Sequence, residues 1–107
     1  ISLMSEKPIV FAMANPYPEI MPEEALKAGV AVMATGRSDY PNQINNSLAF
    51  PGVFRGAIDN KVRKITDQMK LKAAKALAGL VKKPTANMVV PQPFDKRIVP
   101  AIAKVIR

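Results

Sequence analysis

The sequence predicts an α/β fold built on parallel strands, and three observations support that prediction. Residues 8–14 and 30–34 are continuous apolar runs with the length and composition of strands buried on both faces. Residues 22–29, between the two runs, carry the start and stop signals of a short helix. A strand, a helix and a strand within about 30 residues form a βαβ unit, whose strands run parallel with a right-handed crossover.

Prolines end the first predicted strand. Asn15 and Pro16 follow it directly, and Pro18 comes two residues later. Two prolines this close prevent a helix and hold the backbone extended or turned. We therefore expect Asn15 on a turn at the carboxyl end of the strand.

The short helix has boundary signals at both ends. Pro22 suits the first helical position, the two glutamates that follow it suit the positive end of the helix dipole, and Gly29 suits the C-terminal cap. The second strand comes next, and the polar loop 36–46 leaves its carboxyl end. Open parallel sheets bind ligands at this edge, so we expect the loop and the Asn15 turn to converge on the ligand side.

The second half of the chain is predicted to be mostly helical. Apolar residues recur at steps of three and four over residues 52–63 and 66–82, which predicts two helices. Pro51 is expected to keep Phe50 outside the first helix, and Pro84 to stop the second. Beyond Pro84 we expect a short strand over 88–90, a stiff turn over 91–93 and a final helix capped by Asp95, in which Pro100 fits poorly.

The composition excludes several classes of site. The 107 residues contain no Cys and no His, which excludes disulfides, thiolate zinc sites, a Ser-His-Asp triad and His metal ligands within this chain. No apolar run approaches the roughly 18 residues of a membrane span, and no signal peptide is visible. No G-x-G-x-x-G motif is present, so the dinucleotide pyrophosphate loop is absent from these residues.

The net charge of +8 allows two interpretations. A basic surface suits nucleic acid or another anionic ligand. However, nine of the 16 basic residues are Arg55 and residues within 61–83, on predicted helices, and no aromatic residues interleave with them as in RNA-binding motifs. A solvated helix face is therefore the favoured interpretation.

The amide-rich run over residues 42–46 is the most informative local feature. Each amide offers a donor and an acceptor without net charge, which suits a ligand that presents both carboxylate and carboxamide groups. The alternative is an Asn-rich loop whose amides satisfy their own backbone, and a turn-closing role is the corresponding alternative for Asn15. Arg37 and Asp39 are expected to form a local salt bridge. At this level a piece of an enzyme and a small basic binding module both remain open.

Three blocks of the chain resemble the malic enzymes, the NAD(P)-dependent decarboxylating malate dehydrogenases, in particular their short bacterial and archaeal type. Residues 8–20 resemble P-I-V-F-A-L-A-N-P-T-P-E-I, with Tyr17 in place of the usual Thr. Residues 34–57 resemble A-T-G-R-S-D-x-P-N-Q-V-N-N followed by F-P-G-I-F-R-G-A, and residues 90–95 resemble I-P-x-P-F-D. The resemblance is collinear and covers nearly the whole chain.

The resemblance implies the C-terminal part of a Rossmann-like, mostly parallel, doubly wound sheet flanked by helices. Residues 1–107 would be the C-terminal portion of the NAD(P)-binding domain and a fragment of a longer chain, in keeping with a first residue, Ile1, that is not Met. The family's acid/base Tyr and Lys, its metal-binding carboxylates and its Gly-rich loop would lie upstream. NAD or NADP would be the cofactor, and upstream residues would bind a divalent cation, Mg or Mn.

The resemblance also implies which residues form the site. Asn15 and Asn46 match asparagines that bind malate, and Asn15, Asn45 and Asn46 match asparagines that bind the cofactor. No residue of this segment is expected to be catalytic or to bind metal, so the isolated chain is expected to be inactive.

The implied partners are malate and pyruvate, the rest of the polypeptide and a second copy in a homo-oligomer, most simply a dimer. The implied setting is the cytoplasm, without membrane or nucleic acid. The alternative that stays open is a small basic α/β module that binds nucleic acid or an anionic ligand without catalysis.

Overall fold

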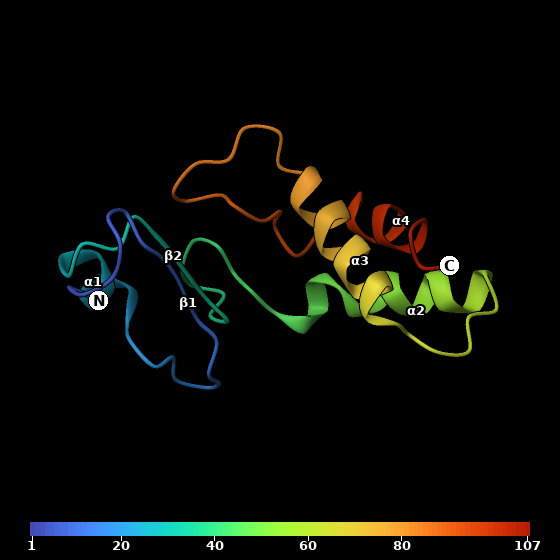
Figure 1. The fold of residues 1–107 in the computed structure, drawn as a ribbon, viewed down its shortest axis with the longest axis horizontal. Coiled ribbons are helices and arrows are strands. Elements are labelled where there is room, and N and C mark those ends of the chain that lie inside the picture. The colour runs from blue at the N-terminus through green and yellow to red at the C-terminus, as the bar shows by residue number, and fades with distance from the viewer. The chain divides into compact units, whose positions relative to one another are not determined.

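A computed structural model describes all of residues 1–107, in two units (Figure 1). The first unit contains residues 1–45 and 84–89, and the second contains residues 46–83 and 90–107. The chain therefore leaves the first unit at Asn45, returns to it for residues 84–89, and then ends in the second unit.

The first unit is the predicted βαβ motif. Strand β1 (Ile9–Ala12) and strand β2 (Val32–Thr35) are parallel neighbours, with Ile9 opposite Val32 and Ala12 opposite Thr35, and helix α1 (Pro22–Lys27) lies between them in sequence. Both strands are shorter than their apolar runs. Val30, for example, donates its backbone N–H to Ala25 O at 3.1 Å, so it closes the end of α1 and does not join the sheet.

The boundaries of α1 follow from the residues that predicted them. Pro22 is the first helical residue, Glu23 and Glu24 occupy the first turn, and Gly29 adopts a left-handed backbone with φ of +99° just after the helix. A proline in the first turn costs nothing, because the N–H that it lacks has no partner within the helix. Glycine tolerates the positive φ at a helix end better than other residues do.

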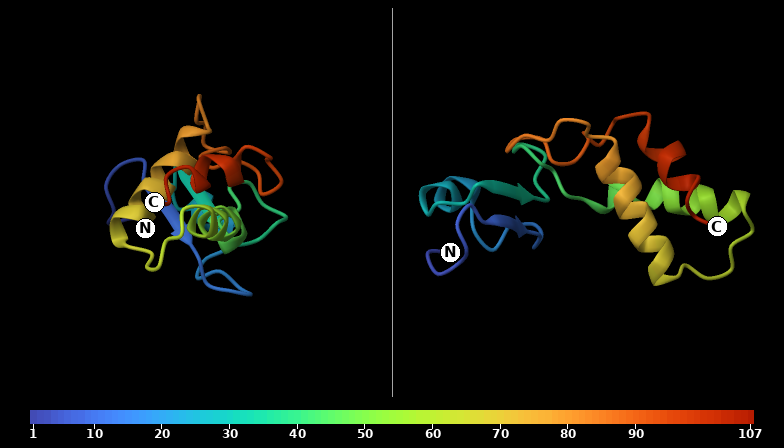
Figure 2. Two further views of the ribbon diagram at one scale, coloured as in Figure 1. Left: turned by 90° about the vertical axis from the view of Figure 1, so that its right-hand side faces the viewer. Right: turned by 45° about the horizontal axis from the view of Figure 1, so that its top comes forward.

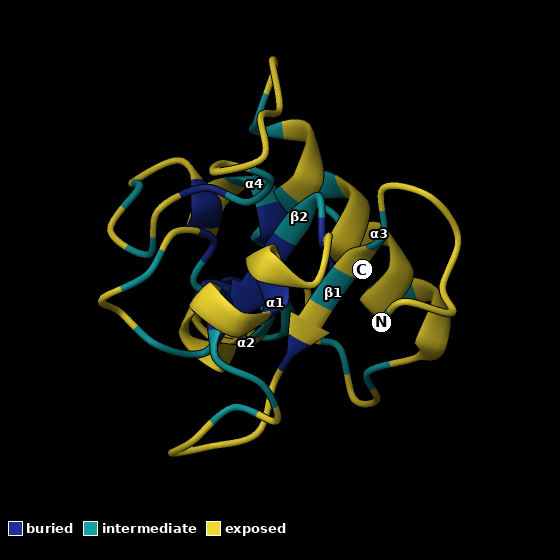
Figure 3. Ribbon diagram, turned by 90° about the vertical axis from the view of Figure 1, so that its left-hand side faces the viewer, coloured by how far each residue is buried: buried dark blue, intermediate teal, exposed yellow.

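One face of the small sheet is packed, and the other is open along β1. The core of this unit contains Ala12, Ala25, Val30 and Met33, all buried. On β1 the alternate residues Ile9 and Phe11 are exposed, and Figure 3 shows β1 more exposed than β2. In a doubly wound sheet both faces are covered, whereas these two apolar residues of β1 are exposed.

The second unit is helical. It contains the 3₁₀ turn η1 (Asn46–Leu48) and helices α2 (Phe50–Asp59), α3 (Asp67–Gly79) and α4 (Ile98–Ala103), which pack against one another (Figure 2). The side chains of its buried core are Leu48, Ala73, Ile98, Ile102 and Ile106. None of the helices combines the length and the apolar composition needed to span a membrane.

Two helix boundaries differ from the prediction for physical reasons. Helix α2 begins at Phe50, not at Gly52, because Pro51 falls in the first turn, where its missing N–H is harmless. Helix α3 does begin after Thr66, whose Oγ1 accepts from Met69 N at 3.2 Å, but it ends at Gly79 instead of residue 82. Glycine is a weak helix former, and it stands at this end.

The prediction for residues 88–90 was wrong. Met88 forms only an isolated antiparallel bridge with Thr85, and Val89 N donates to the side chain of Asn42. The final helix is also shorter than expected, since α4 begins at Ile98. Asp95 Oδ1 still accepts from Arg97 N at 2.9 Å, and Pro100 lies in the first turn of α4, where it is tolerated.

Candidate functional site

Asn15 lies directly beyond β1, on an exposed turn. The hydrogen bond that closes this turn joins Ala14 N to Glu19 Oε1 at 2.9 Å. The Asn15–Pro16 peptide bond is cis. Glu19 is therefore the side chain that closes the turn, and the exposed Asn15 carboxamide sits at the carboxyl end of the strand, as predicted.

The second loop leaves β2 and returns to the same strand end. Ile44 N donates to Thr35 O at 2.7 Å, and Gln43 forms a parallel bridge with Thr35. The buried Thr35 also accepts a bond from Arg37 N through Oγ1, at 3.2 Å. Residues 36–43 thus form a loop that begins after Thr35 and comes back to it at Gln43. Asn45 follows two residues after Gln43.

The two loops meet at Gly36. A Cβ atom placed on Gly36 would lie 2.8 Å from Asn15 Oδ1 and 3.5 Å from Ile44 O. The Asn15 side chain therefore lies against the start of the second loop, next to the carbonyl that precedes Asn45. The expected convergence of the Asn15 turn and the loop 36–46 is confirmed for the residues of the first unit.

Asn42 has a structural role. It is 7% exposed, and its Nδ2 donates to Met33 O at 3.0 Å and to Ala86 O at 2.8 Å. Its Oδ1 accepts from Val89 N at 2.8 Å. Of the two interpretations of the amide run, the structural one holds for this member, whose amide binds backbone groups and attaches residues 84–89 to the first unit.

Asn45 and Asn46 are exposed, and they fall on opposite sides of the boundary between the two units. Asn45 is the last residue of this stretch of the first unit, and Asn46 opens η1 in the second. Ser47 and Leu48 complete η1, and Leu48 is buried in the helical core, which fixes the start of this turn within its own unit. The pairing of Asn15 with Asn46 in one site stays a prediction.

Charged side chains tie the second loop together. Arg37 binds Asp39 through two bonds of 2.9 and 2.8 Å, so the predicted local salt bridge is confirmed. The Arg37 guanidinium carbon also lies 5.4 Å from the centre of the Tyr40 ring. The hydrogen bonds to Arg37 hold the pKa of Asp39 below its ordinary value.

Tyr40 links this loop to α1, an interaction that the sequence analysis missed. Its hydroxyl donates to Glu23 Oε1, in the first turn of the helix. This bond lowers the pKa of Glu23 and raises the pKa of Tyr40. The topology could have indicated this contact, because the first turn of a crossover helix and the loop after the second strand lie at the same edge of a parallel sheet.

Replacing Tyr40 by Phe is expected to release Glu23. Because the Tyr40 hydroxyl is the main cause of the lowered pKa of Glu23, that pKa should rise toward 4.5 in Tyr40→Phe. The hydrogen bond stabilises the folded state above pH 4.5, and this contribution disappears as the pH falls through the lowered pKa. A carboxyl-detected NMR titration of both proteins measures the shift. An unchanged Glu23 pKa in the variant would contradict the assigned hydrogen bond.

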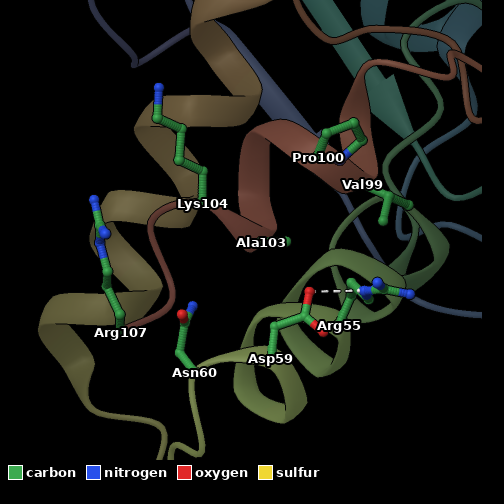
Figure 4. A pocket seen from close by; sticks show the side chains of 8 residues that line it. All are labelled: Arg55, Asp59, Asn60, Val99, Pro100, Ala103, Lys104 and Arg107. Carbon is green, nitrogen blue, oxygen red and sulfur yellow. Dashed lines mark hydrogen bonds and ion pairs between the residues drawn. The ribbon is translucent and has the colours of Figure 1, made fainter.

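A pocket near the end of α2 contains none of the predicted site residues. It has a volume of about 530 Å³ and lies between α2 and α4 (Figure 4). Arg55 is paired with Asp59 at 2.8 Å, and Figure 4 shows the basic ends of Lys104 and Arg107 on the opposite side from the Arg55 guanidinium. Because these cations do not converge, the pocket does not form an anion site.

The exposed amides at the strand ends can orient a ligand, whereas a carboxamide does not transfer protons. An exposed carboxamide donates and accepts hydrogen bonds, which fits a dinucleotide carboxamide or a dicarboxylate. The described residues bring no three carboxylates together, so they do not fit a divalent cation by themselves. The site therefore holds binding groups without a complete catalytic set.

Comparison with known proteins gives one consistent result. Residues 1–105 match the family model for the malic enzyme NAD-binding domain. The bifunctional malic/malolactic enzyme of Bacillus subtilis (strain 168) is 55% identical over 108 residues, which cover 99% of this chain and 26% of that protein.

Solved structures give the same answer. The malic enzyme of Pyrococcus horikoshii Ot3 has a TM-score of 0.93 and 52% identity, over 98% of this chain and 24% of that one. The NAD-dependent malic enzyme of Thermotoga maritima has a TM-score of 0.88 and 46% identity, over 96% of this chain and 27% of that one. The chain spans about a quarter of the length of these relatives. It belongs to the malic enzyme NAD-binding domain family.

Proposed function

We propose that residues 1–107 are the C-terminal portion of the NAD(P)-binding domain of a malate oxidoreductase that decarboxylates oxaloacetate. The match to the malic enzyme NAD-binding domain over residues 1–105 is the observation that carries this proposal. The open face of the sheet at Ile9 and Phe11 supports the view that further parts of the same domain cover it. Relatives named as NAD-dependent and as NADP-dependent support NAD(P) as the cofactor.

The proposed reaction has three steps. A hydride leaves C2 of malate and a proton leaves its 2-hydroxyl group, which gives oxaloacetate. Oxaloacetate then loses CO2, and the enolate that remains is protonated at carbon to give pyruvate. NAD(P)+, when bound, supplies the oxidising group. The proton-transfer groups and any divalent cation would belong to residues outside this segment.

The contribution of this segment is orientation. The Asn15 carboxamide, at the carboxyl end of β1, and the Asn46 carboxamide, at the start of η1, would bind malate so that its C2 hydrogen faces the nicotinamide. Asn15, Asn45 and Asn46 would also bind the cofactor. Holding two reactants in the reactive geometry lowers the entropic part of the barrier, and this effect alone can account for a large rate enhancement.

The resemblance to the family also supports a homodimer and a cytoplasmic setting for the complete protein. Malate and pyruvate would be its small-molecule partners, and the rest of the polypeptide would cover the open face of the sheet. These assignments depend on the family and not on a contact seen in residues 1–107.

The alternative, a basic binding module, is less well supported. Thirteen of the 16 basic residues and only three of the eight acidic ones lie in the second, helical unit. Two of its ion pairs, Arg55–Asp59 and Lys70–Asp67, lie on exposed helix faces. This distribution is typical of solvated helices.

Residues 1–107 alone are expected to lack malate oxidation activity, whereas the complete protein should show it. The reason is that the segment contains neither the pyrophosphate loop nor a proton-transfer pair. Malate-dependent formation of NAD(P)H by both purified proteins measures the difference. Activity of the isolated segment would refute the division of roles proposed here.

A binding titration against RNA at several salt concentrations tests the alternative, since a phosphate binder must lose affinity steeply as salt rises.

A further inference from the structure

Gly36 stands where the Asn15 turn meets the second loop, and its lack of a side chain needs an explanation. Glycine is often required by a positive φ, as at Gly29, but Gly36 does not have a positive φ. Close backbone packing is not the reason either, because Ile44 O would lie 3.5 Å from a Cβ on Gly36, an ordinary van der Waals distance. Asn15 Oδ1, at 2.8 Å, is the tight contact.

We propose that Gly36 is a positioning residue, which permits the carboxamide of Asn15 to lie across the start of the second loop and so sets its orientation. This inference rests on the proposed role of Asn15 in binding malate and cofactor. A methyl group at position 36 would lie 2.8 Å from Asn15 Oδ1, closer than van der Waals contact, so the carboxamide would have to move. The carboxamide would then point away from the direction that the native contact gives it.

The structure also indicates that the change would leave the fold intact. The atom in the way is the far end of an exposed side chain, which can rotate, and no backbone atom lies closer than 3.5 Å. Alanine is compatible with the backbone of Gly36, since its φ lies outside the left-handed region. A change in kinetics without a change in stability is therefore the signature of the proposed role.

Three variants of the complete enzyme test the inference: Gly36→Ala, Asn15→Ala and the double variant. Gly36→Ala is expected to lower malate kcat/KM about 10- to 100-fold, because a misplacement of about 1 Å in an orienting group can cost about 100-fold. Its melting temperature should match that of the native enzyme. Asn15→Ala should also lower kcat/KM. The double variant should be as active as Asn15→Ala alone, because the methyl group then has no carboxamide to displace.

Two glycines provide matched controls. Gly79→Ala introduces the same methyl group where nothing lies within 4 Å, so the kinetics should not change. Gly29→Ala places alanine at a φ of +99°, so it should lower the melting temperature and leave kcat/KM of the folded enzyme unchanged.

The outcomes separate this inference from the proposed function. If Asn15→Ala has native kinetics, Asn15 is not in the site, and both proposals for this residue are overturned. If Asn15→Ala is impaired but Gly36→Ala has native activity, the inference alone is overturned. It is also overturned if the effects of the two substitutions multiply in the double variant. If Gly36→Ala does not fold, the double variant should restore folding, and a double variant that also fails to fold overturns the inference.

Discussion

Asn46→Asp is expected to lower malate kcat/KM further than Asn46→Ala, although aspartate is closer in shape to asparagine. Loss of one hydrogen bond to a charged group costs about 1.5–3 kcal/mol, so Asn46→Ala should lower kcat/KM about 10- to 150-fold. The aspartate instead places a negative charge next to a malate carboxylate. Like charges about 4 Å apart repel by roughly 4 kcal/mol at the effective dielectric of a protein surface.

A purely structural role for Asn46 predicts the reverse order. Aspartate terminates loops and begins helical turns nearly as well as asparagine does, so a loop role would leave Asn46→Asp active. Steady-state kinetics of both variants of the complete enzyme decide between the two roles, with melting curves to detect misfolding. Asn87→Asp is a matched control, because Asn87 is an exposed asparagine outside the proposed site. An Asn46→Asp variant with native activity would remove Asn46 from the site.

Asn42→Ala is expected to destabilise the first unit by about 3 kcal/mol, since three hydrogen bonds of about 1 kcal/mol each are lost. Asn42 also has a φ of +57°, a conformation that favours asparagine and glycine over alanine. Asn42→Gly therefore loses the same bonds with less backbone strain, and it should be less destabilising than alanine. Asn42→Asp keeps the acceptor for Val89 N but turns an oxygen toward the carbonyls of Met33 and Ala86.

Amide hydrogen exchange gives the most local readout of this prediction. Val89 N–H, which is bound to Asn42 Oδ1, should exchange faster in Asn42→Ala and Asn42→Gly. The residues of the helical core around Ile102 should keep their protection. Native stability and native exchange at Val89 in Asn42→Ala would show that Asn42 does not attach residues 84–89.

The βαβ motif could be predicted from the sequence because its signals are local. Pro22 and Gly29 mark both ends of α1, and the apolar runs on either side leave few alternatives to strands. Topology then placed Asn15 and the second loop at one edge, since the crossover forces parallel strands. The convergence of the two loops follows from that topology.

The return of residues 84–89 to the first unit could not be predicted, because it depends on partners far apart in sequence. Asn42 binds Ala86 and Val89, which are 44 and 47 residues away. Val89 looks like a strand residue by composition, yet its N–H is taken by a side chain and not by a neighbouring strand. No pattern within a short window carries that information.

The roles of single residues in the candidate site could not be predicted from the sequence either. Asn42 and Asn45 are chemically identical and three positions apart, but the first is buried with its amide fully used and the second is exposed. Only the folded structure separates them. The proposed role of Gly36 could not be predicted from the sequence for a different reason. Glycine has no side chain whose chemistry would indicate a role, and the proposed role depends on the space that it leaves beside Asn15.

A crystal structure of the complete enzyme with NAD(P)+ and a non-reactive analogue of malate tests the central claim most directly. If this segment orients the substrate, the carboxamide nitrogens of Asn15 and Asn46 should lie within hydrogen-bond distance, about 2.7–3.2 Å, of the analogue or the nicotinamide group. If both carboxamides bind only protein atoms while the analogue occupies another part of the enzyme, the account of the site is wrong.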